Sequence, residues 1–249
     1  MSLRSLVIFG SLSLLTIFVG MFWWLVFSNS DAEPAAANGA NESHTTPKNV
    51  LADRVAAESA TVEILDYGFG ENHYEVQAVV IVRGEVDGQT AELVTASVNF
   101  LDGEGEILAT EALSQYLKWN GQQLVIPVSA YGLEPGTVKS IDPTVVVTNN
   151  KLPGLNVEKI NPIKSTETSV GFGGDYNATF AMTNETEIDW MDITVGIACY
   201  GGEGEIIGGG SAYPGPLLMG KSLRLEASVT TSNEPEFCEA FPHPSLLRQ

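Results

Sequence analysis

The sequence predicts an all-β protein, in which two tandem immunoglobulin-like β-sandwich domains follow one N-terminal transmembrane helix. Three observations lead to this fold class. A long uncharged apolar run opens the chain, apolar and polar residues alternate over much of the remaining sequence, and the alternating part occurs twice. Alternation with a period of two residues is typical of half-buried strands, whereas a surface helix repeats every 3.6 residues.

The first element, residues 1–27, is predicted to be a transmembrane signal-anchor helix. Leu6 to Phe27 is almost continuously apolar, about 22 residues or roughly 33 Å as a helix, which is enough to span a bilayer. Arg4 precedes this run and Asp31 comes after it, so the positive-inside rule places the N-terminus in the cytoplasm. We therefore expect a single-pass cell-membrane protein with extracytoplasmic domains. A cleaved signal peptide is the alternative, because small residues come after the run.

The second element, residues 28–58, is predicted to be a flexible linker. It is rich in Ala, Asn, Glu, Ser and Pro and has few large apolar residues. Such a segment buries too little surface to offset its ordering entropy.

The remaining chain contains an internal repeat with an offset of 99 residues, seen best where Leu101–Leu108 (LDGEGEIL) matches Tyr200–Ile207 (YGGEGEII). Apolar residues alternate before both stretches, and the Gly-containing turns between strands suit hairpins because Gly tolerates positive φ. Units of about 90 residues with a turn every 8 to 12 residues predict sandwiches of roughly seven strands. We place the two domains at residues 59–149 and 150–249.

Within these repeats the chain resembles the FxLYD family of exported domains, whose signature strand runs into Tyr-Asp and a Gly-containing turn. The matching stretches are Val98–Asp102 (VNFLD) and Ile197–Gly201 (IACYG), which lack the Tyr and the Asp respectively. The family's Val-x-Asn-x-Thr turn resembles Met182–Thr186 (MTNET), whereas Arg83 replaces the Asn in the first repeat. The resemblance implies an immunoglobulin-like sandwich outside the cytoplasm and carries no catalytic residues to this chain.

Net charge restricts the partners. With 31 acidic and 12 basic residues, the formal charge of −19 would repel nucleic-acid phosphates, so we expect no nucleic-acid partner. Two interpretations of this charge stay open. It keeps the protein soluble, also in high salt, or it attracts divalent cations or basic partners.

The only two cysteines are Cys199 and Cys238, both in the second repeat of an exported chain. Disulfides persist outside the cytoplasm, so a disulfide between them is the first interpretation, and two buried thiols are the second. The three histidines, His44, His73 and His243, have no ligand spacing to either Cys, so no metal site is predicted.

Two further groups of polar residues are candidate sites. The acidic hairpin tips could offer carboxylates to Ca²⁺, although they lack the EF-hand pattern, and a solvated turn is the simpler interpretation. Three tripeptides fit the N-glycosylation acceptor. The tip residues are Asp102, Glu104, Glu106, Glu203 and Glu205, and the acceptors are Asn41, Asn177 and Asn184.

No nucleophile elbow, metalloprotease motif or complete phosphate loop occurs, so we predict no enzyme and no cofactor. The first hypothesis is a surface module for protein association, which predicts an exposed apolar patch or a free edge strand. The second is a carbohydrate or cell-envelope binding module, which needs at least two exposed, coplanar aromatic rings. A third is an accessory subunit whose helix packs in the membrane. The aromatic candidates of the second hypothesis are Tyr116, Trp119, Trp190 and Tyr213.

Overall fold

The computed structural model describes residues 61–244 apart from 87–89 and 154–159. The predicted transmembrane helix at 1–27, the linker at 28–58, Asn41 and His44 lie outside these residues. Every regular element in the described part is a strand, and no helix there is long and apolar enough to cross a bilayer. The prediction of an all-β, sandwich-like fold is confirmed for this part of the chain.

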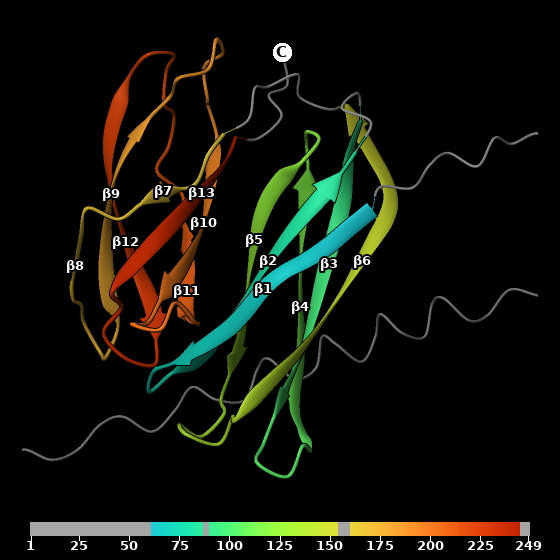
Figure 1. Cartoon of the computed structure of the whole chain (residues 1–249), viewed down its shortest axis with the longest axis vertical. Helices are drawn as coiled ribbons and strands as arrows, with labels where there is room; N and C mark the ends of the chain where they lie inside the picture. Colours follow the sequence, from blue (N-terminus) through green and yellow to red (C-terminus); the bar gives the residue numbers. More distant parts are fainter. Residues whose placement is uncertain (1–60, 87–89, 154–159, 245–249) are drawn as a thin grey trace, which may run out of the picture. The chain divides into compact units, whose positions relative to one another are not determined.

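The first half contains six strands in two antiparallel three-stranded sheets, ordered β1-β2-β5 and β4-β3-β6 (Figure 1). Their inward faces share one apolar core, in which Val94, Ala96, Val98 and Phe100 alternate with polar residues along β3, as the period of two predicts. We call this half the first sandwich. Its strands are β1 (Thr61–Glu71), β2 (Glu75–Glu85), β3 (Thr90–Leu101), β4 (Ile107–Leu117), β5 (Gln122–Tyr131) and β6 (Ser140–Pro153).

The second half contains one seven-stranded sheet, in the order β7-β13-β10-β11-β12-β9-β8, which folds over a core of its own. We call this sandwich-like half the second sandwich. Its counterpart of β1 is broken into two short strands that pair with different neighbours, β7 with β13 and β8 with β9. The strands are β7 (Ile163–Lys164), β8 (Glu167–Val170), β9 (Tyr176–Thr183), β10 (Ile193–Tyr200), β11 (Ile206–Ala212), β12 (Ser222–Thr231) and β13 (Phe237–Pro244). The first sandwich extends beyond its predicted end at residue 149, because β6 continues to pair with β3 as far as Pro153.

The internal repeat is visible in the backbone of the two hairpins. Asp102 N–H donates to the Glu106 carbonyl at 3.0 Å, and Gly201 N–H donates to the Glu205 carbonyl at 2.9 Å. The turns contain Gly105 and Gly204 with φ of 84° and 83°, values that favour glycine. The register shifts at the same place in both hairpins, so the repeated sequence forms the same bulged turn twice.

The two sandwiches meet through outward faces that are apolar. Val79, Ile81 and Val125 of the first sandwich form one cluster with Ala198, Ile206 and Phe241 of the second. Glycines permit a close approach: a Cβ on Gly68 would lie 2.1 Å from the Ile206 carbonyl oxygen, and one on Gly196 would lie 2.6 Å from that of Val125. The contact is therefore made partly by backbone atoms.

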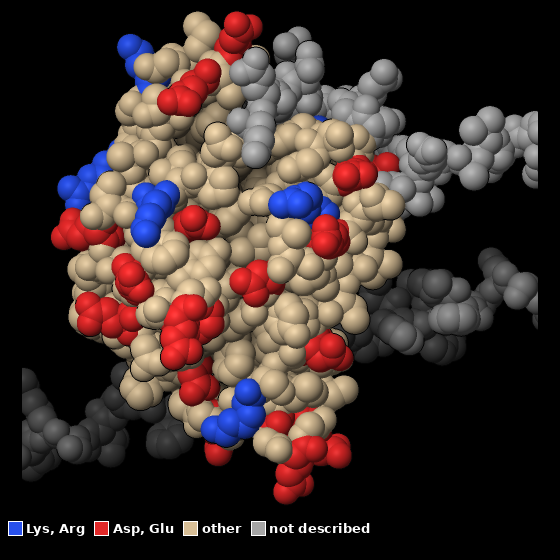
Figure 2. Space-filling model, viewed as in Figure 1, with Lys and Arg blue, Asp and Glu red and all other residues tan. Residues whose placement is uncertain are grey.

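The outward faces that do not take part in this contact are polar. On β3 they carry Thr95, Ser97 and Asn99, and on β12 they carry Arg224, Glu226 and Ser228. Acidic side chains are spread over the viewed face of the molecule (Figure 2). The distribution of apolar residues thus favours one contact between the halves and solvent on the other faces.

Candidate interaction site

The four candidate aromatic residues do not form an exposed platform. Trp119 and Trp190 are 5% and 2% exposed, and Tyr116 is half-buried. Tyr213 alone among the four is exposed, at 73%. The two indoles fill space inside the protein, as large aromatic side chains commonly do.

Cys199 and Cys238 form a disulfide with an S–S distance of 2.05 Å. They lie directly opposite each other on β10 and β13, and both are fully buried in the core of the second sandwich. The disulfide therefore joins β13 to β10, its neighbour in the sheet.

The two sequons in the described part differ in accessibility. Asn184 is fully buried, and its Nδ2 donates hydrogen bonds to the carbonyls of Ile188 and Leu217 at 2.8 and 2.9 Å. Asn177 is half-buried on β9. Both amide hydrogens of Asn184 are used inside the fold, so the folded protein does not present this side chain for glycosylation.

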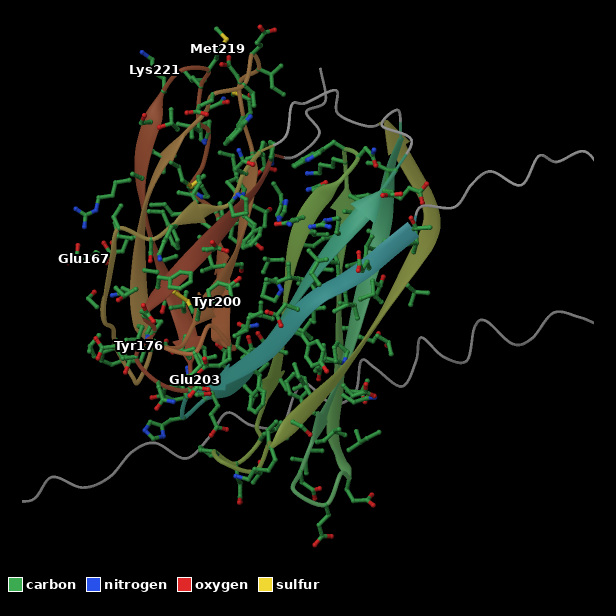
Figure 3. The ribbon with its side chains drawn as sticks, in the orientation of Figure 1. Glu167, Tyr176, Tyr200, Glu203, Met219 and Lys221 are labelled. Atoms are coloured by element: carbon green, nitrogen blue, oxygen red, sulfur yellow. A yellow bond between two sulfur atoms is a disulfide. The ribbon has the colours of Figure 1, made fainter. Side chains whose placement is uncertain are left out.

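At the acidic tips, the carboxylate of Asp102 accepts hydrogen bonds from the backbone N–H groups of Glu104 and Glu106 at 2.8 and 2.9 Å. Glu205 accepts one from the N–H of Glu203 at 3.0 Å. These bonds hold the turns themselves. Figure 3 shows Glu203 far from Met219 and Lys221, which lie at the other end of the second sandwich. Within the described residues no three His, Cys, Asp or Glu side chains are grouped as metal ligands would be.

The edge strands of the sheets differ in how they are protected against pairing with another chain. β7 and β8 have only two and four residues. β5 carries Pro127 and β6 carries Pro143, and proline has no N–H to offer. β1 carries Glu63 and Asp66 beside a register shift. β4 has 11 residues, no proline and one charge, Glu111, so it is the least protected edge in the described part of the chain.

A groove runs along this edge of β4 and consists of two adjoining hollows that share Leu113. One, of about 280 Å³, is lined by Glu111, Ala112 and Leu113 and by residues of β5; the other, of about 290 Å³, continues toward Lys118. Successive side chains of a strand point to opposite faces, so a hollow lined by successive residues lies along the strand's edge. The second sandwich forms the far wall through Ser211, Thr194, Tyr213 and His243.

The corresponding edge of the second sandwich is paired over part of its length. There β11, the counterpart of β4, pairs with β12 at Gly208–Thr231 and Gly209–Thr230. In the first sandwich β4 pairs, among the described strands, with β3 only, and β5 with β2 only. Among the described strands the edge of β4 is therefore open along its whole length, whereas that of β11 is paired at Gly208 and Gly209.

Buried polar groups form one end of the groove. The Lys118 ammonium donates to the Pro244 carbonyl, and the Lys118 backbone N–H donates to Gln122 Oε1 at 2.6 Å. Burial lowers the pKa of Lys118 to about 8, although the nearby Asp192 carboxylate opposes the shift. Burial, together with the Lys118 charge, lowers the pKa of His243 to about 3. At neutral pH the imidazole is therefore uncharged and Lys118 is mostly protonated.

Sequence reasoning missed this groove. One signal was available: Ala78 to Val82 on β2 is a continuous apolar run, which indicates a strand buried on both faces. That run predicts a second partner for the sheet, and the groove lies beside the resulting contact. No sequence signal indicates that β4 has a free edge, because an edge is a property of the sheet order.

Comparisons with known proteins supply no family. No family model and no curated protein matches the chain. Solved structures that match include a mutant of Bacillus subtilis oxalate decarboxylase OxdC, with 9% sequence identity and a TM-score of 0.14 over 77% of this chain and 79% of that chain. Bacillus subtilis oxalate decarboxylase at pH 4.6 matches with 10% identity and a TM-score of 0.11 over 74% and 76%. Similarity this low supports no inference about fold or activity.

Proposed function

We propose that this chain is a non-enzymatic, membrane-anchored extracytoplasmic protein that presents two FxLYD-like, immunoglobulin-like sandwiches to a protein partner. The partner binds in the groove along β4. The observation that carries the proposal is the long, nearly uncharged edge of β4 beside a groove lined by residues of both sandwiches. A free edge strand is what the protein-association hypothesis requires, and soluble proteins usually protect such edges.

Photo-cross-linking tests this site. A photoreactive amino acid replaces Leu113 in the full chain, which is expressed in the source cells and irradiated. We expect a discrete protein adduct. The matched control replaces Val146, which is 58% exposed on β6, outside the groove, and should give no such adduct. Equal labelling at both positions, or none at Leu113, would reject the groove as the partner site.

The location is tested separately by adding protease to intact cells. We expect the sandwiches to be digested or shaved from the surface while a cytoplasmic marker survives. Full protection of the sandwiches in intact cells, with digestion after lysis, would contradict an extracytoplasmic location.

A carbohydrate or cell-envelope ligand is the second candidate, supported by a different pair of rings. Tyr74 is 67% exposed and Phe172 is 93% exposed, and they belong to neighbouring turns, since a Cβ on Gly173 would lie 3.3 Å from the Tyr74 ring. Exposed rings stack on sugars in many binding modules. Binding of purified envelope polysaccharide that is lost in both Tyr74→Ala and Phe172→Ala would favour this candidate over the groove.

A further inference from the structure

We infer that the groove receives one extended segment of a partner polypeptide, which pairs with β4 as an added strand. This inference rests on the proposed function and specifies its ligand: a main chain in β conformation, uncharged or basic, rather than a folded surface or a second copy of this chain.

The direction of the β4 backbone groups can be read from its neighbours. The Leu101 carbonyl accepts from Lys139 N–H at 2.8 Å, and the Ser97 carbonyl accepts from Thr144 Oγ1 at 3.4 Å, so both carbonyls face β6. In an antiparallel sheet the N–H and C=O of one residue point to the same side. Ser97 therefore directs its backbone groups away from Ala112, its partner on β4.

Ala112 must then direct its own N–H and C=O to the free edge. The backbone groups of Thr110 and Ser114, each two residues away along the strand, point the same way. Side-chain distances agree, because pairs without backbone hydrogen bonds bring their side chains closest. Thr95 Oγ1 lies 2.7 Å from Ser114 Oγ, and Thr110 Oγ1 lies 2.7 Å from Asn99 Oδ1. By the same alternation Pro143, which lies opposite Val98, directs its backbone nitrogen to the free edge of β6, where proline has no N–H to offer a further strand.

The length of the groove suits a strand. From Glu111 to Lys118 the chain spans about 23 Å at roughly 3.3 Å per residue, which is long enough for a typical strand of about five to six residues. The outward backbone N–H and C=O groups of Ala112 and Ser114 can pair with the backbone of another chain, whatever side chains that chain carries. Main-chain pairing of this kind supplies affinity in strand addition, while the walls select side chains.

The walls and the charge select the occupant. Pro127 lines the space beside β4 on one side, and Ser211 and Tyr213 line it on the other, so an extended chain enters it more readily than a folded surface does. A second copy would bring a complete sandwich and another formal charge of −19. Glu111, the one charge on β4, favours a basic side chain opposite it, whereas the Lys118 ammonium at the other end of the groove already donates to the Pro244 carbonyl.

The test selects random ten-residue peptides displayed on phage against the full chain in detergent micelles, and the bound peptides are then synthesised. We expect enriched peptides whose binding falls at least tenfold with Ala112→Pro, which removes the outward N–H, and is unchanged with the matched control Ala112→Ser, which keeps it. Loss of the native circular dichroism spectrum in Ala112→Pro would make that variant uninformative, so a second arm leaves the protein unaltered.

In the second arm, peptides carry N-methyl groups on alternate backbone nitrogens. One of the two alternating sets should abolish binding and the other should not, because only one edge of the peptide faces β4. No enrichment, equal loss from both sets, or dimers of the full chain that form through Ala112 would each overturn the inference. Adducts at Leu113 in cells together with failed peptide selection would reject strand addition and leave the proposed function standing.

Discussion

Gln122 Nε2 lies 2.9 Å from His243 Nδ1, across the contact between the two sandwiches. Gln122 Oε1 already accepts the backbone N–H of Lys118, so the amide nitrogen faces the imidazole and donates to it. Nδ1 is then the acceptor, and the neutral ring carries its proton on Nε2, which is buried and has no hydrogen-bond partner among the described residues. This one pair fixes the tautomer of the ring and links β5 to β13.

Acid should destabilise the protein through His243. Its pKa is lowered from 6.5 to about 3, so between these values the unfolded chain binds a proton that the folded protein does not. The contribution to stability is complete above pH 6.5 and is lost as the pH falls toward 3, by about 2 kcal/mol at pH 5. Urea unfolding at about pH 7.5 and about pH 5 should show a smaller pH effect in His243→Gln than in the native chain. His73→Gln, at an exposed position, is the control and should keep the native pH effect.

Adding one methyl group to β1 should disturb the contact between the sandwiches. A Cβ on Gly70 would lie 2.4 Å from the Ile207 carbonyl oxygen and 2.5 Å from Thr231 Cα, where backbone must move. We expect Gly70→Ala to cost about 1–3 kcal/mol in the free energy of unfolding. Gly103→Ala is the control, because its Cβ would meet Lys139 Cγ at 3.7 Å, an ordinary contact. Equal melting temperatures for Gly70→Ala and Gly103→Ala would contradict the close backbone approach at Gly70.

Reduction of the Cys199–Cys238 disulfide should lower the melting temperature. The bridge spans 39 residues, and the chain-entropy relation gives about 4 kcal/mol for a loop of that length. Thermal melting with and without reductant measures the effect. A Cys199→Ala, Cys238→Ala double variant should melt at the same temperature as the reduced native chain, and reductant should not change that temperature. An unchanged melting temperature, with free thiols demonstrated chemically, would show that the bridge contributes little.

Truncation to Ala should destabilise the protein at one phenylalanine of the second sandwich and leave its stability almost unchanged at another. Phe180 is fully buried, so Phe180→Ala should cost about 3–5 kcal/mol. Phe172 is 93% exposed, so Phe172→Ala should change the free energy of unfolding by less than about 0.5 kcal/mol. Denaturant unfolding of the two variants compares them directly. A large cost at Phe172 would mean that this ring is covered by something in solution.

Local patterns allowed much of the fold to be predicted. The alternation of Val94, Ala96 and Val98 placed β3, and the Gly-containing turns placed both hairpins. The expected export of the chain predicted the Cys199–Cys238 disulfide as the first interpretation, and the structure contains this bond. The strand and the hairpins depend on residues close together in the sequence, where strand period and turn geometry leave few choices.

The candidate site could not be predicted in the same way. The groove depends on sheet order, on β11 pairing with β12 while β4 stays open, and on Pro127 lying opposite β4. Each is a relationship between segments distant in the sequence. Trp119 and Trp190 show the same limit, because an aromatic residue near a turn can cover the core or face the solvent, and tertiary packing decides between the two.

The glycine contacts between the sandwiches also have a mechanical consequence. Long side chains can rotate and let two surfaces slide, but backbone pressed against backbone at Gly68, Gly70 and Gly196 has no such freedom. Tension that reaches β1 would therefore pass into β11 without a hinge between them. The two sandwiches would then respond to tension as one rigid unit and would not separate at a flexible joint.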